Sequence, residues 1–463
     1  MPQIPPTPSS IHALSAFLYV MLALSGVGAA VFHWPVLTWA GVGCTVAFLV
    51  LQFRNVPRFQ AIMALVMIAI GLSVGSQSEK VADVLVDGLI KAQLFLVLFF
   101  AVAWLQIPAA DSPALRAVRR TVVSQPPGWR FSYLVGAGHI LGSVLNIAGL
   151  VLLSTMVERQ TDAGLQRRMA SALMQGFVAA SIWSPFYVSV IVVLIALPEL
   201  DWSDAIFHGL PIAAVTVACA WIFDRVVHRR PPPGSSLSGN PQPPGYPLGM
   251  RHRINLAGVL GALVVVVVGT VELSGLSLPV VLALVAPPFG VVWMTLLAGP
   301  AVAAGRSAAH LAGVVFDRLP GLRNEALAFT AASVFGIGVA AGMPADALGM
   351  LSNGGALTIA GLVFGVVGLG LCGLHPVIPV IFIGEALPPD VIGLPAETIG
   401  MALLGAWGLS TLVSPVSGTT LMMSKFVGIS SHTIAWRWNT PYALVATTVV
   451  SLSVIAAWRM HLY

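Results

Sequence analysis

The stretch ASIWSPFY, residues 180–187, lies inside a long apolar segment, and the similar string STLVSPVS occupies residues 410–417. Proline removes a backbone hydrogen-bond donor and disturbs the helical turn before it. Hydrocarbon offers no water to satisfy the backbone groups that such a break releases. We therefore predict that two membrane helices are broken in the same way. The two Ser-Pro pairs, 230 residues apart, are Ser184-Pro185 and Ser414-Pro415.

The composition indicates a polytopic membrane protein. Of the 463 residues, 57% are hydrophobic and only 8% are charged, whereas soluble domains carry about 25% charged residues. Many apolar runs reach the roughly 18 residues needed to cross a bilayer. The basic residues behind the net charge of +5 lie in short loops, where they act as orientation signals rather than as a nucleic-acid footprint. We expect a multi-pass protein of the cell inner membrane with a cytoplasmic N-terminus and no nucleic-acid partner.

No soluble catalytic motif stands out in the sequence. There is no phosphate loop, no paired Cys or His metal set and no Gly-x-Ser-x-Gly elbow. Cys44, Cys219 and Cys372 lie in apolar segments at unrelated spacings. Such a distribution is typical of packing residues rather than of a disulfide or metal site. We therefore expect a protein that is not an enzyme and has no cofactor apart from a coupling ion.

Two further apolar stretches are predicted not to cross the membrane. Residues 131–157 have arginines at both ends, so both ends should lie on the cytoplasmic side. Residues 356–387 are followed by EALPPDVIGLPAETIG, which contains three acids and no Lys or Arg, so both of their ends look extracytoplasmic. Each pattern is typical of a re-entrant hairpin, and the two hairpins would enter from opposite faces. Inverted-topology repeats of this kind are a recurring plan of secondary transporters.

The predicted fold class is an all-α polytopic membrane protein with two inverted-topology repeats, each with a re-entrant hairpin and a broken transmembrane helix. A Pro-, Gly- and Ser-rich stretch is predicted to form a cytoplasmic linker between the repeats at 225–253. The first repeat, 1–224, comprises scaffold spans 11–107, hairpin 131–157 and broken helix 169–198. The second repeat, 254–463, comprises scaffold spans 254–345, hairpin 356–387 and broken helix 398–424.

Two matched strings give the chain a resemblance to a known superfamily. LNIAGLVLLSTMV begins at Leu145 and LHPVIPVIFIGEAL begins at Leu374, an offset of 229 residues. The first string resembles the hairpin-tip element of the ion transporter superfamily, which includes divalent anion:sodium symporters and arsenite efflux permeases. The second string resembles the second copy of that element. The two Ser-Pro stretches resemble the paired broken helices that follow each hairpin.

The chain departs from the superfamily pattern at both tips. Only Asn146 remains of the Ser-Asn-Thr pattern at the first tip, and His375-Pro376 stands where Asn-Thr would be at the second. A Ser-Asn pair does occur at Ser352-Asn353, but it precedes the second hairpin, where a turn or a helix cap is the expected role. The sodium and carboxylate sites of the symporters therefore do not transfer directly to this chain.

What the resemblance implies is an ion-coupled permease for a small, organic anion. It would work by an elevator-type alternating-access movement of the hairpin-bearing part against a scaffold, and such scaffolds form homodimers in the superfamily. Coupling to Na⁺ and coupling to H⁺ both stay open. One alternative is the membrane subunit of a binding-protein-dependent carrier of the same superfamily, and another is a membrane-embedded enzyme. The expected partners are the anionic solute, the coupling cation, the lipid bilayer and a second copy of the chain.

The tips and the broken helices are expected to meet in one polar chamber near the midplane. Half-helix N-termini carry positive partial charge and can hold an anion without Arg or Lys, and freed carbonyl groups can hold a cation. The candidate solute-binding residues are Ser143, Asn146, Ser184, Pro185, Ser189, Gly373, His375, Ser414, Pro415, Ser417, Gly418 and Thr419. The candidates for binding the coupling ion are Asn146, His375 and Thr420.

A structural role competes with each of these assignments. Hydroxyl groups in membrane helices mostly bond their own backbone or a neighbouring helix. An ionisable side chain in a membrane segment is a candidate functional group, so His375 could contact the solute or take a coupling proton. It could equally stay neutral, bond a carbonyl group and hold the hairpin tip rigid.

Overall fold

The computed structural model is helical, with no strand among the residues that it describes. These residues are 10–113, 130–158, 160, 162–227, 250–299, 304–343 and 354–462. Within them, ten helical segments are long and apolar enough to cross a membrane. The prediction of an all-α polytopic membrane protein is therefore confirmed. Ser352 and Asn353 lie outside the described residues.

Contacts divide the chain into two compact units. Unit 1 comprises Met1–Pro108 and Gly261–Met343, and unit 2 comprises Ala109–Leu260 and Pro344–Tyr463. Unit 1 draws on both ranges that the sequence predicts to be scaffold. Unit 2 holds the ranges predicted to form the two hairpins and the two broken helices. Each unit therefore combines segments from both halves of the sequence.

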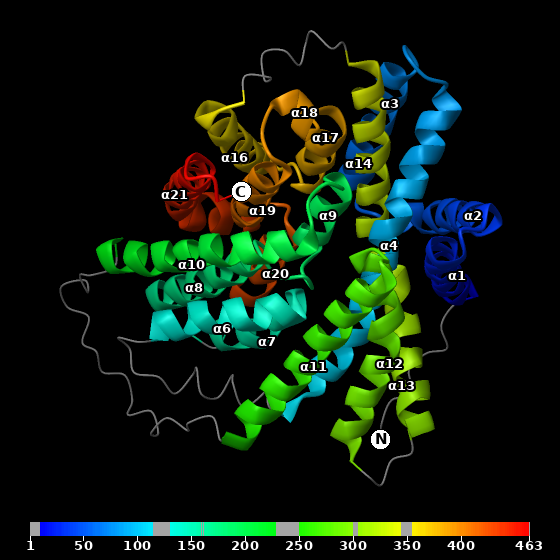
Figure 1. Cartoon of the computed structure of the whole chain (residues 1–463). Helices are drawn as coiled ribbons and strands as arrows, with labels where there is room; N and C mark the ends of the chain where they lie inside the picture. The colour runs from blue at the N-terminus through cyan, green and yellow to red at the C-terminus, as the bar shows by residue number, and fades with distance from the viewer. Residues whose placement is uncertain are drawn as a thin grey trace. The chain divides into compact units, whose positions relative to one another are not determined.

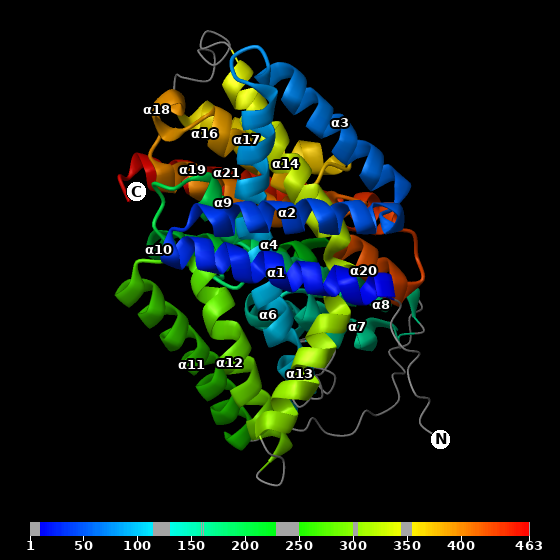
Figure 2. The same cartoon turned by 90° about the vertical axis from the view of Figure 1, so that its right-hand side faces the viewer.

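Unit 1 consists of helices from two stretches of the chain. The first stretch forms α1 (Ser10–Phe32), α2 (Pro35–Gln52), the short η1 (Phe53–Asn55), α3 (Arg58–Gly75) and α4 (Val81–Asp111). The second forms α11 (Met250–Ser274), which begins within unit 2, then α12 (Leu278–Ala298), α13 (Ala304–Arg318), η2 (Leu319–Leu322) and α14 (Arg323–Gly342). Helices α1 and α2 lie side by side (Figure 2).

The core of unit 1 combines an aromatic cluster with a glycine-lined helix crossing. Tyr19 packs edge-on against Phe48 with ring centroids 5.0 Å apart, and its hydroxyl donates to the carbonyl oxygen of Leu96 at 3.2 Å. Helices α3 and α14 approach each other at backbone distance, because a Cβ at Gly71 or at Gly338 would overlap the backbone of the opposite helix. Small residues allow membrane helices to pack this closely.

Unit 2 contains two sets of helices from different parts of the sequence. The first set is α6 (Arg130–Leu145), α7 (Ile147–Glu158), α8 (Ala163–Ala180), α9 (Val188–Ala196) and α10 (Trp202–Val227). The second set is α16 (Ala356–Leu371), α17 (Val377–Ala386), the short α18 (Pro389–Ile392), α19 (Ala396–Val413), α20 (Gly418–Val427), η3 (Thr433–Asn439) and α21 (Thr440–Arg459). Helices α6, α8 and α10 lie side by side (Figure 1).

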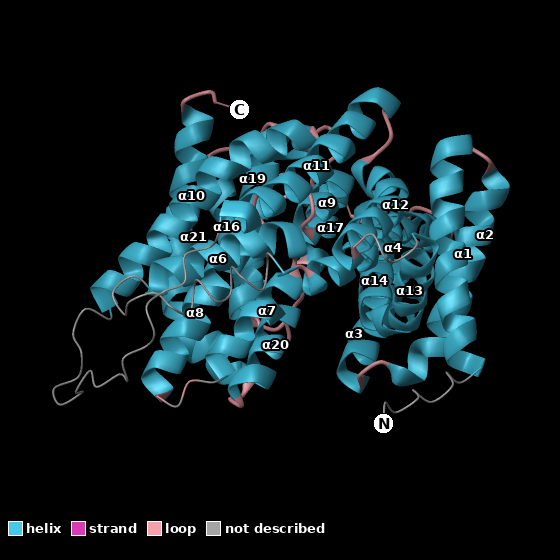
Figure 3. Ribbon diagram, turned by 90° about the horizontal axis from the view of Figure 1, so that it is seen from below, coloured by secondary structure: helices cyan, strands magenta, loops and turns pink. Residues whose placement is uncertain are grey.

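The two sets contact each other in a reciprocal way. Helix α6 lies against α8, and α16 lies against α19. Helix α7 lies against α20 (Figure 3), while α9 lies against α17. The second arm of each helix pair therefore contacts the second half of the interrupted helix from the other set. Helices α8 and α19 are the most deeply buried, with almost every residue of 169–180 and 396–413 buried.

The segments predicted as hairpins are each two helices rather than one rod. Asn146 separates α6 from α7 and has a left-handed φ of 52°. A Cβ at Gly149 would overlap the carbonyl group of Leu141, so the first turn of α7 folds back onto α6. Residues 372–376 separate α16 from α17, and Gly373 has a left-handed φ of 89°.

The predicted linker has regular structure at both ends. Helix α10 continues to Val227 and α11 begins at Met250, so the ends of the range 225–253 are helical. The remaining residues, 228–249, lie outside the described part of the chain. The last turns of α10 are held by an ion pair with α8, since Arg168 Nε and a terminal nitrogen of Arg168 donate to the two carboxylate oxygens of Asp224 at 2.7 and 2.6 Å. Such bidentate pairing fixes orientation as well as contact.

Substitution of Gly176 by Ala should destabilise unit 2. A Cβ at Gly176 would overlap the carbonyl oxygen of Val135, so α6 and α8 would have to separate. Overpacking of this kind costs about 1–3 kcal/mol. Gly136→Ala is the matched control, because a Cβ there meets nothing within 4 Å. Thermal unfolding in detergent should show a lower Tm for Gly176→Ala only, and equal Tm values for both variants would contradict the close approach of α6 to α8.

Candidate solute-binding site

The first Ser-Pro break interrupts the helix between α8 and α9. The amide of Ser184 donates to the carbonyl oxygen of Ala180 at 3.2 Å, and the amide of Tyr187 donates to the carbonyl oxygen of Ser184 at 3.0 Å. The hydroxyl of Ser189 donates to the carbonyl oxygen of Ser181 at 2.5 Å. Ser189 is fully buried. Its hydroxyl therefore satisfies a backbone group that the break around Pro185 releases, which is the structural role that competes with solute binding.

The first break is joined to the tip of the first helix pair at two points. The hydroxyl of Ser184 donates to the carbonyl oxygen of Ser143 and accepts from the amide of Phe186 at 3.2 Å. One turn earlier on α6, His139 Nε2 accepts from the indole nitrogen of Trp183 at 3.2 Å. The sequence analysis missed His139, although an ionisable residue inside an apolar segment is a signal that could have found it.

The tip between α6 and α7 is built around Asn146. Its amide donates to the carbonyl oxygen of Gly142 and closes α6, while its own carbonyl oxygen accepts from the amide of Gly149 and opens α7, both at 3.0 Å. Asn146 is 6% exposed. Asparagine adopts the left-handed conformation more readily than most residues. The left-handed backbone conformation therefore favours asparagine at position 146, whether or not its side-chain amide binds a ligand.

The second Ser-Pro break has its own hydroxyl cap. The hydroxyl of Ser417 accepts from the amide of Thr420 at 3.2 Å and donates to the carbonyl oxygen of Thr411 at 2.6 Å. The hydroxyl of Thr420 lies 3.3 Å from the same carbonyl oxygen. Ser417 thus caps α20 while it ties α20 back to α19 across Pro415. Thr419 follows in the first turn of α20 and is 5% exposed.

Two buried hydroxyl groups near the second break lack a protein partner among the described residues. They belong to Ser410 and Ser414, which are 0% and 1% exposed and lie one turn apart at the end of α19. A buried polar group without a partner costs about 1–3 kcal/mol. A buried polar group without a protein partner in a native protein calls for an explanation, and one explanation is that it binds an ion or a water molecule. Ser414 is among the sequence candidates, whereas Ser410 was missed because it lies before the Ser-Pro pair.

The tip between α16 and α17 begins with a glycine-based helix stop. The amide of Leu374 donates to the carbonyl oxygen of Leu369 at 3.0 Å, and the amide of Gly373 donates to the carbonyl oxygen of Gly370 at 2.9 Å. This is the Schellman pattern, in which glycine takes the left-handed position. Gly373 is therefore needed for the turn itself.

His375 lies just before α17 and faces a buried aromatic residue. Its Nδ1 accepts from the amide of Val377 at 3.3 Å. Its ring stands edge-on to Trp407 of α19, with centroids 5.9 Å apart. These contacts give the imidazole a positioning role at the tip. Contact with a solute and proton uptake stay predictions for His375.

Three contacts bring the two tips and the two breaks together within unit 2. Ser184 of the first break bonds Ser143 of the first tip. The Cβ position of Gly418, which begins α20, lies 3.7 Å from the side chain of Ile147, which begins α7. The Cβ position of Gly373 lies 4.0 Å from Val416 of the second break. The N-termini of α7 and α20 therefore meet at the first tip.

The comparisons with known proteins bear on the fold. No known protein family and no curated protein sequence matches the chain. Among solved structures, the YdaH transporter of Alcanivorax borkumensis superposes with a TM-score of 0.53 at 14% identity, over 87% of this chain and 98% of that chain. MtrF of Neisseria gonorrhoeae, described with a class of antimetabolite efflux pumps, superposes with a TM-score of 0.46 at 13% identity, over 78% of this chain and 80% of that chain. The chain has the fold of a solved membrane transporter. Membership of the ion transporter superfamily stays a prediction.

Substitutions of Asn146 should separate its backbone role from its amide role. Asn146→Gly keeps the left-handed conformation accessible, so its Tm should stay close to that of the wild type. Asn146→Val should be less stable by about 1–2 kcal/mol or more, because a β-branched residue is strained at this φ. Thermal unfolding in detergent measures both. If the valine variant were as stable as the glycine variant, the tip would not depend on the left-handed turn.

Proposed function

We propose that the protein is an ion-coupled secondary transporter of a small organic anion in the cell inner membrane. The observation that carries the proposal is the meeting of two helix-pair tips and two interrupted helices in unit 2. Secondary transporters place their solute sites where interrupted helices meet near the bilayer midplane. The YdaH transporter fold over 87% of the chain supports the same class of function.

An anionic solute is favoured by the electrostatics of the first tip. Helix α7 begins at Ile147 and α20 begins at Gly418, and the side chain of Ile147 lies 3.7 Å from the Cβ position of Gly418. A helix N-terminus carries about half a positive charge and presents free amide groups. Two such ends side by side favour an anion without any basic side chain. Asn146 and Thr419 lie at these two ends and are the candidates to complete the solute site.

A coupling cation would fit the oxygen-rich second break. The unpartnered hydroxyls of Ser410 and Ser414 offer neutral oxygen ligands next to the tip of the second helix pair, since Ser410 lies against Gly370 of α16. Sodium ions are bound by such oxygens and by carbonyl groups released at helix breaks. Proton coupling would instead use His375. The hydroxyl of Thr420 contacts Ser417 and Thr411 in the cap of α20, and a role in binding the coupling ion stays a prediction for Thr420.

The transport movement would use the division of the chain into two units. Unit 2 would carry the solute and unit 1 would be the scaffold of an elevator-type mechanism, with a homodimer formed through the scaffold. The repeated order of elements and their reciprocal contacts support two inverted repeats. An inverted pair gives the site two equivalent routes of access, one from each side of the membrane.

The alternative functions differ in what they require. A binding-protein-dependent carrier would transport only when a soluble binding protein delivers the solute. A membrane-embedded enzyme would convert the anion rather than move it. Uptake of unmodified solute by the purified chain alone in liposomes would therefore distinguish the proposal from both.

The direct test is a panel of small organic anions, each added to the purified protein with and without sodium. A substrate should raise Tm, by an amount that grows with concentration as mass action requires. Sodium coupling predicts a larger rise in the presence of sodium. Hits would then be tested for uptake into proteoliposomes under an imposed sodium or proton gradient. An uptake rate that changes with neither the sodium gradient nor the proton gradient would contradict ion-coupled transport.

If transport is coupled to protons, replacing His375 by Gln should abolish coupled uptake while the protein is still expressed and folded. Glutamine has similar size but cannot take up a proton, and it replaces the ring that faces Trp407. His432→Gln is the matched control, because His432 is exposed, directly precedes η3 and belongs to neither tip. The measurements are initial uptake rates across a pH series. An unchanged rate and pH profile for His375→Gln would remove this residue from the mechanism.

A further inference from the structure

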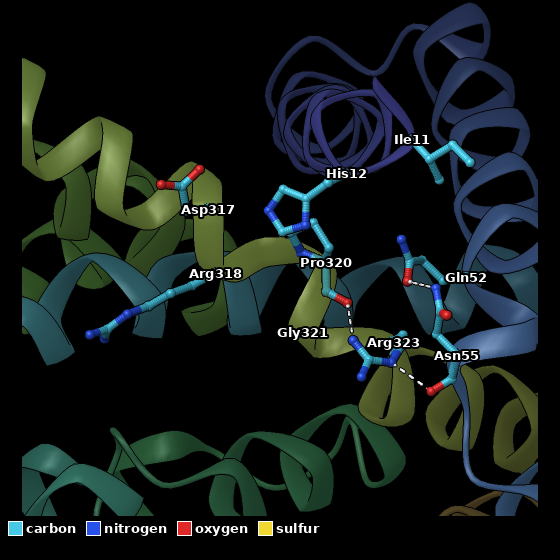
Figure 4. A pocket seen from close by; sticks show the side chains of 9 residues that line it. All are labelled: Ile11, His12, Gln52, Asn55, Asp317, Arg318, Pro320, Gly321 and Arg323. Carbon is cyan, nitrogen blue, oxygen red and sulfur yellow. Dashed lines mark hydrogen bonds between the residues drawn. The ribbon is translucent and has the colours of Figure 1, made fainter. Parts of the chain in front are cut away.

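A cavity of about 620 Å³ opens in unit 1, whereas the residues of the candidate solute site belong to unit 2. It lies between the first turn of α1, the end of α2, η1 and the connection from α13 to α14 (Figure 4). Its inner wall carries His12, Gln52, Asn55, Pro320 and Arg323. The side chain of Arg318 extends away from this group. None of these residues belongs to the candidate solute site.

The polar atoms of the wall offer donors more than acceptors. Arg323 donates from Nε to the carbonyl oxygen of Asn55 at 2.9 Å and from a terminal nitrogen to the carbonyl oxygen of Pro320 at 3.2 Å. A guanidinium group has five N–H groups, so others remain for a ligand. The two backbone oxygens hold the guanidinium group in place, which lowers the entropy lost when an anion binds.

The two side-chain amides add spare donors to the wall. Gln52, which is 3% exposed, donates from Nε2 to the hydroxyl of Ser15 at 2.7 Å, and its carbonyl oxygen accepts from Asn55 Nδ2 at 3.0 Å. Each amide nitrogen carries two hydrogens and uses one of them in these bonds. One N–H therefore remains on each amide for an acceptor-rich ligand such as a phosphate group.

The surroundings of the cavity are basic on one side and apolar on another. Arg323 is the base on the wall, Asp317 is the acid in the lining, and Glu325 in the first turn of α14 interacts electrostatically with Arg323. Arg54 of η1 and Arg58 at the start of α3 add positive charge next to Asn55 in the sequence. Ile11 also lines the cavity. From Ile11, exposed apolar side chains continue along α1 at helical spacing: Leu14, Phe17, Met21 and Leu24. A phosphate group in the cavity could thus carry an acyl chain along α1.

We propose that this cavity binds the phosphate headgroup of an anionic phospholipid, with an acyl chain on the exposed face of α1. Basic pockets between membrane helices are known to hold such headgroups. The shared chemistry, a phosphate group, could also come from a soluble anion, but a soluble anion makes no use of the apolar face that starts at Ile11. The bound lipid would tie α1 and α2 to the α13–α14 connection and so stabilise unit 1. This proposal is independent of the transported solute.

The test uses the full chain purified in an uncharged detergent, with thermal unfolding as the readout. Phosphatidylglycerol, phosphatidylcholine with the same acyl chains, and inorganic phosphate are titrated separately. Phosphatidylglycerol should raise Tm at a lower concentration than phosphatidylcholine, and millimolar phosphate should not reproduce the effect. Equal stabilisation by the two lipids would overturn the proposal. Stabilisation by inorganic phosphate, with none added by phosphatidylglycerol, would reassign the cavity to a soluble anion.

Two lining variants and one control locate the lipid effect. Arg323→Gln should raise the half-maximal phosphatidylglycerol concentration by about tenfold, as expected for the loss of a charge-assisted bond. Because Arg323 also holds Asn55 and Pro320, His12→Ala serves as the second variant, and it leaves those two bonds in place. Arg459→Gln, at an exposed arginine at the end of α21, is the control and should not change the titration. Wild-type titrations for both lining variants would overturn the site.

Discussion

The structure depends on one constraint: a backbone group released inside a membrane must find a partner within the protein. Pro185 and Pro415 each interrupt a deeply buried helix. Hydroxyl groups near each break donate hydrogen bonds to the carbonyl groups that the break releases. Ser189 reaches back to the carbonyl group of Ser181 in the first break. Ser417 reaches back to Thr411 in the second. In each break, a hydroxyl group after the proline therefore satisfies a carbonyl group before it.

The two breaks differ in how completely they are satisfied. The Ser184 hydroxyl bonds the neighbouring tip, so the first break and the α6–α7 pair are joined. The hydroxyls of Ser410 and Ser414 are buried without a protein partner among the described residues. This difference motivates our placing of the coupling ion near the second break and of the anion at the joined N-termini of α7 and α20.

Much of the fold could be predicted because its signals are local in sequence. Span lengths follow from apolar runs, and the interruptions at Ser184-Pro185 and Ser414-Pro415 follow from the chemistry of proline. The roles of single side chains could not be predicted in the same way. Whether the hydroxyl of Ser189 or Ser417 faces a ligand or its own backbone depends on the turn that follows the break. His139 and Ser410 were missed because the residues they contact, Trp183 and Gly370, are distant from them in sequence.

The central claim, that two helix-pair hairpins enter the membrane from opposite faces, is tested most directly by cysteine labelling. Cysteines at Ala163 and Asp390, both exposed and each just after one helix pair, would be introduced singly after replacement of Cys44, Cys219 and Cys372. A membrane-impermeant maleimide would be applied to intact cells and to inverted vesicles. The account predicts that position 390 labels from outside and position 163 only from the cytoplasmic side. Labelling of both positions from the same side would contradict the inverted arrangement and the shared site built on it.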